Sequence, residues 1–164
     1  MKIIDQRVAV LVDVQNMFYS AKNKYNAKLD FEKLLDTVVL GRKLIRAIAY
    51  IVQTRDIDQS GFINLLKNKG FEVKSKILKQ RADGSAKGDW DMGLAIDAIS
   101  IAHKVDAIAL VSGDGDFTDL VNHLKASGVR VEVHSFMTST AEELINSATE
   151  YFALDENLLM PFKK

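Results

Sequence analysis

The sequence of 164 residues contains no cysteine and a single proline. The absence of cysteine excludes disulfides, thiolate catalysis and cysteine-ligated zinc sites. No apolar run approaches the roughly 18 uncharged residues that a membrane-spanning helix needs. The first residues, MKIIDQRVAVLVDVQ, place charges on both sides of a short apolar run, which is typical of a strand rather than a signal peptide. These absences predict a cytoplasmic protein that does not associate with a membrane.

The sequence also lacks linkers, low-complexity segments and internal repeats. No stretch is rich in glycine or serine, and no segment recurs with the period of a solenoid. Hydrophobic residues make up 48% of the chain, which is enough to form a substantial core. We therefore expect residues 1–164 to form one domain.

Charge is balanced overall but unevenly distributed. Lysine and arginine total 22, as do aspartate and glutamate. Basic residues gather between Lys67 and Lys87, whereas seven aspartates and one lysine lie between Asp89 and Leu120. This segregation favours an acidic pocket beside a basic rim, although chance clustering of surface charge gives the same pattern.

Apolar β-branched runs alternate with segments of helical spacing. Strands are expected at residues 7–14, 43–52, 71–78, 106–113 and 129–136. Helices are expected at residues 15–22, 31–41, 60–68, 90–104, 117–128 and 138–148. Ser60 is expected to cap the helix at 60–68, and a Ser/Thr capping box to start the helix at 138–148. A loop is expected at residues 79–89. The alternation predicts an α/β fold, a three-layer parallel sheet with helices on both faces.

Aspartates occur where several of these elements meet. Asp13 ends the first strand, and Asp114 and Asp116 follow the fourth. Asp89 and Asp91 stand where a loop enters the helix before that strand. Because ligands of parallel sheets bind outside the carboxyl ends of the strands, we expect all five carboxylates on one edge of the sheet.

Four of these carboxylates come from three separate segments: Asp13, Asp91, Asp114 and Asp116. Such a set suits a hard divalent cation that takes oxygen ligands, namely Mg²⁺ or Mn²⁺. A cation of this kind can activate a water and stabilise the leaving oxygen of a phosphate ester. The sequence therefore predicts a substrate that is a phosphodiester or a phosphomonoester. Asp89 competes with Asp91, since either can point inward from the start of a helix.

Each of several other polar residues near these positions could have either a functional or a purely structural role. Asn16 could orient a phosphate or a water, or cap its helix. Ser112 could help the backbone approach a phosphate, or serve a plain strand-to-helix turn. Lys87 could clamp a phosphate or be a solvated loop lysine. Asp119 is expected to support or cap rather than to bind a cation, and Asp97 is expected on the surface of its helix.

Three motifs carry a resemblance to a known family: VDVQNMFY, KGDWDMGLAIDAI and LVSGDGDFTDLVNHLKASGVRVEV, in this order. Together they resemble the NYN domain in its bacterial LabA-like branch, which is similar to PIN-domain nucleases. The resemblance implies a PIN-like, Rossmann-like domain with metal-dependent ribonuclease activity. The family's acidic and polar positions fall here on Asp13, Asn16, Asp91, Asp114 and Asp116.

The second motif departs from the family pattern. The family often has K-G-x-D, whereas KGDWD contains one residue more. We prefer Asp91 to Asp89 as the matching position because Asp91 keeps the six-residue spacing to Asp97.

We therefore predict a Mg²⁺- or Mn²⁺-dependent nuclease acting on single-stranded RNA. Tyr19, Tyr25 and Trp90 could stack on bases, with core packing the favoured role of Trp90. The alternative is a non-catalytic regulatory or scaffold module that binds metal, nucleotide or RNA, with YFALDENLLMPF closing the domain or serving a partner or a homodimer. The phosphate backbone of RNA is expected to contact Lys74, Lys76, Lys79, Arg81 and Lys87.

Overall fold

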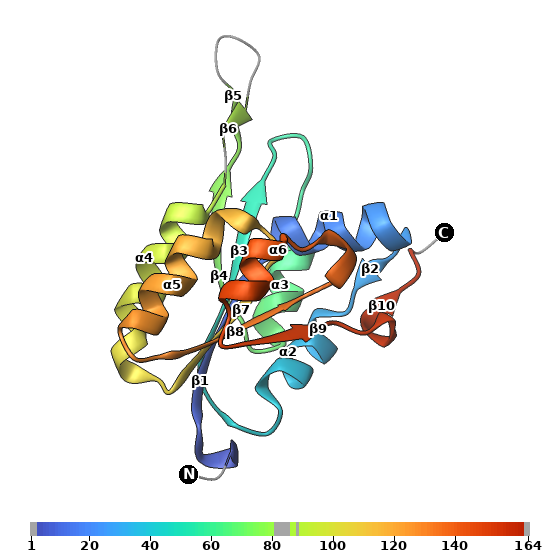
Figure 1. The fold of residues 1–164 in the computed structure, drawn as a ribbon. Helices are drawn as coiled ribbons and strands as arrows, with labels where there is room; N and C mark the ends of the chain where they lie inside the picture. Colours follow the sequence, from blue (N-terminus) through green and yellow to red (C-terminus); the bar gives the residue numbers. More distant parts are fainter. Residues whose placement is uncertain (1–2, 81–85, 88, 163–164) are drawn as a thin grey trace.

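The computed structural model describes residues 3–80, 86–87 and 89–162. Its centre is a six-stranded sheet in which every neighbouring pair is parallel (Figure 1). In spatial order the strands are β4 (Glu72–Ile77), β3 (Lys43–Gln53), β1 (Arg7–Asp13), β7 (Ala107–Val111), β8 (Arg130–Ser135) and β9 (Glu150–Ala153). The predicted parallel sheet is confirmed.

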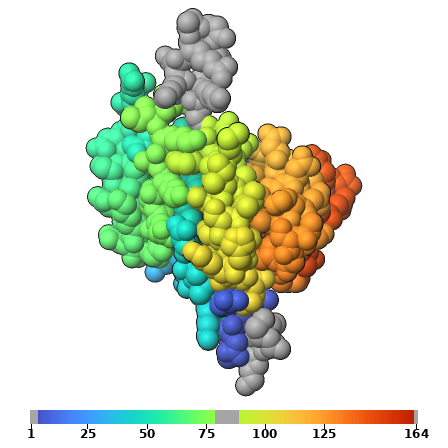
Figure 2. Space-filling model, turned by 90° about the vertical axis from the view of Figure 1, so that its left-hand side faces the viewer, coloured from blue at the N-terminus to red at the C-terminus, as the bar shows by residue number. Residues whose placement is uncertain are grey.

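Helices cover both faces of this sheet. One face is covered by α1 (Val14–Tyr25), α2 (Phe31–Val39) and α3 (Ser60–Asn68). The other is covered by α4 (Asp91–Ile101), α5 (Thr118–Ala126) and α6 (Glu142–Ser147). Figure 2 shows the second face, where α4 (yellow) and α5 (orange) lie side by side. The three layers predicted from the alternation of strands and helices are therefore present.

Short elements complete the described chain. Two small antiparallel pairs join β2 (Lys28–Leu29) to β10 (Leu159–Met160) and β5 (Lys79–Gln80) to β6 (Ala86–Lys87). The 3-10 turns are η1 (Ile3–Asp5), η2 (Ala102–Lys104), η3 (Gly115–Phe117), η4 (Met137–Ser139) and η5 (Glu156–Leu158). Within the part of the chain described here, no helix has the length and apolar character needed to cross a membrane.

The central strand β1 is buried on both faces because its side chains alternate between two cores. Val8, Val10 and Val12 belong to the core under α1, α2 and α3. Ala9 and Leu11 belong to the core under α4, α5 and α6. This is the near-continuous apolar run that a central parallel strand requires, and it explains why β1 is among the clearest strands in the sequence.

The order of the strands reverses between β1 and β7. The chain builds outward from β1 through β3 to β4, and then returns to the other side of β1 with β7, β8 and β9. In doubly wound sheets this switch point opens a crevice at the carboxyl ends of the strands, where ligands bind. Asp13 ends β1, and the loop holding Asp114 follows β7, so both lie at this crevice.

Several details of the sequence prediction are wrong. The sheet has a sixth strand, β9, in a segment for which no strand was expected. The β5–β6 pair lies where a loop was expected, and Figure 1 places it beyond the carboxyl ends of β3 and β4. The expected caps of α3 and α6 do not form, since Gln59 and Ala141 precede these helices without a side-chain cap.

A buried ion cluster ties β8 to the turn between α2 and β3. The side chains of Arg42 and Glu132 are 5% and 2% exposed and form a two-pronged ion pair at 2.6 and 3.0 Å. Arg130 and His134 contact the same carboxylate at 3.2 and 3.0 Å. Burial alone would raise the pKa of Glu132, but the hydrogen bonds from His134 and Arg42 outweigh it and lower that pKa to about 2.

Candidate metal centre

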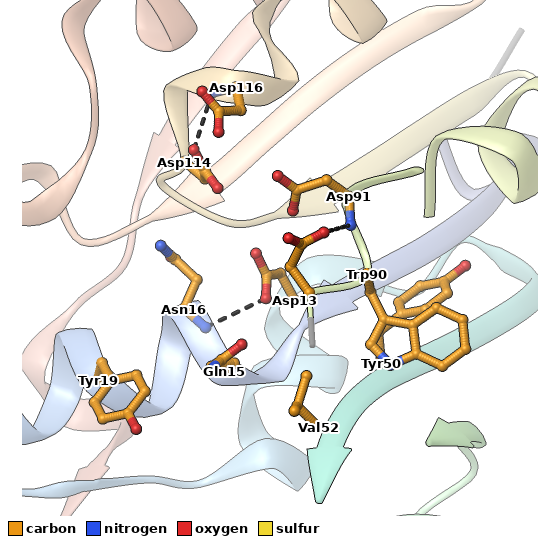
Figure 3. Close-up of a pocket in the computed structure, with 11 residues that line it drawn as sticks. Asp13, Gln15, Asn16, Tyr19, Tyr50, Val52, Trp90, Asp91, Asp114 and Asp116 are labelled. Carbon is orange, nitrogen blue, oxygen red and sulfur yellow. Dashed lines mark hydrogen bonds between the residues drawn. The ribbon is translucent and has the colours of Figure 1, made fainter. Parts of the chain in front are cut away.

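A pocket of about 350 Å³ opens at the crevice between β1 and β7 (Figure 3). Its walls come from the start of α1, the ends of β1 and β3, the entry to α4 and the loop after β7. The lining residues are Asp13, Gln15, Asn16, Tyr19, Tyr50, Val52, Asp89, Trp90, Asp91, Asp114 and Asp116. The structure therefore brings together the five carboxylates that the sequence placed on one edge of the sheet.

Three of these carboxylates converge most closely. Asp13, Asp91 and Asp114 each offer an oxygen, and these oxygens all lie within 4.8 Å of one another. We call this set the aspartate triad. Its members come from three segments that are far apart in the sequence, and its all-oxygen donor set is the kind that a hard divalent cation prefers.

Asp13 is held by two hydrogen bonds. One of its carboxylate oxygens accepts the backbone N–H of Asn16 at 3.2 Å, which caps α1, and the other accepts the hydroxyl of Ser112 at 3.1 Å. Burial raises the pKa of Asp13 to about 6, although both hydrogen bonds act to lower it. The side chain is therefore fixed in position, and its negative charge is costly in the metal-free pocket.

Asn16 and Ser112 join α1 to the loop that holds Asp114. The side-chain oxygen of Asn16 accepts the backbone N–H of Gly113 at 2.9 Å. The hydroxyl of Ser112 accepts the backbone N–H of Asp114 at 3.1 Å, while Asp114 itself accepts the N–H of Asp116 at 2.9 Å. Both residues therefore help to fix the position of Asp114 relative to Asp13. The side-chain amide nitrogen of Asn16 forms no hydrogen bond with any described residue.

Two glycines let this acidic loop lie against the first turn of α6 and the segment before it. A Cβ on Gly113 would collide with the carbonyl oxygen of Ser139, and one on Gly115 would lie 2.6 Å from a carboxylate oxygen of Glu143. The backbone N–H of Ala141 donates to the carbonyl of Gly113 at 3.0 Å. The S-G-D-G-D pattern thus reflects close backbone packing as well as charge.

The carboxylates of the pocket form no ion pair with a lysine, arginine or histidine among the described residues; Asp97, which pairs with Lys74, lies outside the pocket. Burial and, after it, the other carboxylates of the pocket, Asp114 first, together raise the pKa of Asp91 to about 6. Among the described residues, no lysine, arginine or histidine lines the pocket. A bound dication would remove this repulsion, so the electrostatics of the pocket fit a metal centre.

The remaining predicted acidic residues lie around the triad. Asp116 and Asp89 line the pocket but are exposed and outside the triad, and Asp89 accepts the backbone N–H of Asp91 at 3.2 Å. Asp119 is exposed in the first turn of α5 and does not line the pocket. Of the two competing positions in KGDWD, it is Asp91 that joins the triad.

The predicted RNA-binding lysines of β4 have intramolecular partners. Lys74 forms an ion pair with Asp97 at 2.7 Å, and Lys76 donates to the backbone carbonyl of Asp89 at 3.0 Å. Lys79 and Lys87 belong to the β5–β6 pair, but their side chains, like the whole of Arg81, lie outside the described residues. Their contact with RNA stays a prediction.

Asp97 is not the surface charge that its helical position predicts. Its side chain is 19% exposed and accepts hydrogen bonds from the hydroxyl of Tyr50 and the ammonium of Lys74, both at 2.7 Å. These partners come from β3 and β4, so the spacing along the helix alone could not reveal them. Tyr50 itself was missed as a pocket residue because it reads as an ordinary residue of a buried strand.

The three aromatic residues considered for base stacking differ in their surroundings. Tyr19 lines the pocket with 49% of its surface exposed. Tyr25 packs on Phe136 with ring centroids 5.2 Å apart and does not line the pocket. Trp90 lines the pocket and also packs against the core under α4, as favoured from the sequence.

Comparison with proteins of known structure supports the fold. A protein of unknown function from Vibrio parahaemolyticus superposes with a TM-score of 0.89 at 37% identity, covering 98% of this chain and 99% of that one. The T5 D15 protein, co-crystallized with metal ions, superposes with a TM-score of 0.50 at 16% identity, covering 85% of this chain and 59% of that one. The predicted PIN-like α/β fold is confirmed.

Sequence comparison agrees with this result. The low amplitude and bright protein LabA of Synechococcus elongatus is 30% identical over 158 residues, covering 92% of this chain and 84% of the relative. An uncharacterized protein of Methanocaldococcus jannaschii is 27% identical over 172 residues, covering 98% of this chain and 62% of that protein. The NYN domain family matches residues 7–155 and thereby spans both halves of the sheet and all three triad positions, so the chain belongs to the NYN domain family.

Proposed function

We propose that this protein is a metal-dependent ribonuclease that hydrolyses phosphodiester bonds of single-stranded RNA at the aspartate triad. One observation carries the proposal: three carboxylate oxygens lie within 4.8 Å of one another at the switch point of the sheet. No described cation lines the pocket to neutralise them. A chain that keeps like charges together at an energetic cost is adapted to a cationic ligand.

The donor set determines which cation fits. Asp13, Asp91 and Asp114 would hold Mg²⁺ or Mn²⁺, since carboxylate oxygens without histidine or cysteine suit these ions better than zinc. When bound, the ion supplies activation of a water and stabilisation of charge on the phosphate. Asp13 would contribute a pre-positioned ligand because two hydrogen bonds already hold it.

Other residues of the pocket would bind the substrate. The amide nitrogen of Asn16 would donate to a phosphate oxygen, because its side-chain oxygen already accepts from Gly113. The exposed ring of Tyr19 would stack on a base next to the scissile phosphate. Asp116 and Asp89, at the exposed side of the pocket, would add negative charge that draws the cation in. A homodimer stays a prediction.

The test is an RNA-cleavage assay with purified protein and a labelled single-stranded oligonucleotide. Cleavage should require Mg²⁺ or Mn²⁺ and stop with chelator. Asp114→Asn and Asp13→Asn should lower the rate by more than about 100-fold, since even residues that only support metal ligands often cost 10–100-fold. Asp119→Asn is the matched control and should keep the wild-type rate, because Asp119 lies outside the pocket.

Two outcomes would contradict the proposal. Equal cleavage by the wild type and Asp114→Asn would show that the nuclease is a contaminant. Metal-dependent RNA binding without any cleavage would instead support the non-catalytic module.

A further inference from the structure

The three ligands of the aspartate triad are not held equally. The carboxylate of Asp13 accepts two hydrogen bonds, and that of Asp114 accepts one. Among the described residues, no hydrogen bond reaches the carboxylate of Asp91, whereas like charges on neighbouring aspartates repel it. Among the described residues, the contacts that hold Asp91 are therefore those of its backbone and of the residues directly before it.

We propose that Trp90 is a positioning residue that fixes the start of α4 and thereby holds Asp91 in the triad. This inference rests on the metal-dependent function proposed above. Trp90 directly precedes α4, and its indole N–H donates to the backbone carbonyl of Ile51 in β3 at 2.8 Å. The hydrogen bond connects the residue next to Asp91 to the central sheet.

A second set of contacts holds the indole ring from the side of the sheet. Its centroid lies 5.5 Å from that of Tyr50, and the ammonium of Lys76 lies 4.1 Å from the ring centroid (Figure 3 shows Trp90 next to Tyr50). The same ammonium donates to the carbonyl of Asp89 at 3.0 Å. A lysine of β4 therefore binds both residues that lead into α4, and its ring contact adds a cation–π attraction.

The third contact comes from α4 itself. A Cβ on Gly93 would lie 2.6 and 2.9 Å from two ring carbons of Trp90, which real Cβ atoms do not tolerate. Glycine inside a helix is destabilising relative to alanine. Its presence here permits the ring to lie against the first turn of α4, the turn that begins with Asp91.

Mn²⁺ affinity, measured by isothermal titration calorimetry, tests this role without relying on catalysis. Trp90→Phe removes the indole N–H but keeps an aromatic ring, and Gly93→Ala displaces that ring from the other side. Each should raise the dissociation constant roughly ten-fold, the lower end of the effect seen when supporting partners of metal ligands are removed. Leu124→Ala is the control: it opens a cavity in the buried core under α5 and should leave the affinity unchanged.

A double-mutant cycle separates positioning from general stability. In an Asp91→Asn background, titrated to millimolar Mn²⁺, Trp90→Phe should have no further effect on affinity, because the residue that it positions no longer contributes its charge. Wild-type affinity in both Trp90→Phe and Gly93→Ala, or an equal loss with and without Asp91, would overturn the inference while leaving the metal site intact. A wild-type protein that binds no Mn²⁺ would overturn the proposed function and this inference together.

Discussion

Two regions of this molecule bury carboxylates, and they treat the charge in opposite ways. In the ion cluster on β8, Glu132 contacts Arg42, Arg130 and His134, and its pKa falls to about 2. In the aspartate triad, Asp13 has hydrogen bonds but no described cation beside it, and its pKa rises to about 6. The first arrangement is complete within the chain and serves the fold. The second has no such partner among the described residues, which supports the proposal that a cation binds there.

The largest expected effect comes from breaking the complete cluster. Arg42→Met should lower the free energy of unfolding by about 3–5 kcal/mol, because it leaves Glu132 buried and without its main partner. Urea unfolding at pH 7 measures this loss. Adding Glu132→Gln should restore part of it, since the uncompensated charge is then gone. A loss below about 1 kcal/mol, the range of surface pairs, would show that Glu132 does not depend on its cationic partners.

The next largest expected effect comes from adding Mn²⁺ to the aspartate triad. Mn²⁺ at a hundred times its dissociation constant should add about 2.7 kcal/mol to the free energy of unfolding. Asp114→Asn should lose this gain, whereas Arg42→Met, although less stable, should retain it because Arg42 lies outside the pocket. Urea unfolding with metal and with chelator gives both values. A gain that persists in Asp114→Asn would place the ion elsewhere.

A smaller effect follows from the raised pKa of Asp91. Its ordinary value is 3.8 and the folded value is about 6, so ionisation destabilises the metal-free fold progressively as the pH rises from about 4 to about 6. Asp91→Asn should therefore stabilise the metal-free protein at pH 7 by about 1 kcal/mol, after allowance for solvent screening. The gain should fall to a small remainder at about pH 3.5, where Asp91 is neutral in the folded protein and mostly neutral in the unfolded chain. Chelator-treated samples unfolded in urea at the two pH values provide the measurement.

The smallest effect distinguishes the two arginines on Glu132. Arg130 is 31% exposed and shares its guanidinium between Glu132 and Glu150. Arg130→Met should cost less than about 1 kcal/mol in urea unfolding, because solvent screens the pair and Arg42 still contacts Glu132. A cost as large as that of Arg42→Met would mean that the cluster acts as one indivisible network.

The sequence predicts the layers, the parallel sheet and the crevice residues well because these depend on local patterns. Apolar runs such as RVAVLVDV mark buried strands, and the position of Asp13 and Asp114 after such runs places them at the same edge of the sheet. Strand β9 escaped prediction because its four residues, half-buried at most, carry no strong alternation.

Contacts between distant segments could not be predicted. Nothing near Asp97 in the sequence indicates that Tyr50 and Lys74 bind it. The cluster around Glu132 is equally hidden, since Arg42 lies in a turn that ordinary spacing rules read as exposed. For the same reason the role of Trp90 becomes visible only when Ile51, Lys76 and Gly93 are seen around it.

The wide separation of Asp13, Asp91 and Asp114 along the chain has a consequence for biosynthesis. A nascent polypeptide that has left the ribosome only as far as α4 carries two of these acids, but β7, which must pair with β1 to deliver the third, does not yet exist. A ribonuclease of the kind proposed would thus stay inert beside its own messenger and the ribosomal RNA until the segment that carries β7 and Asp114 has been synthesised.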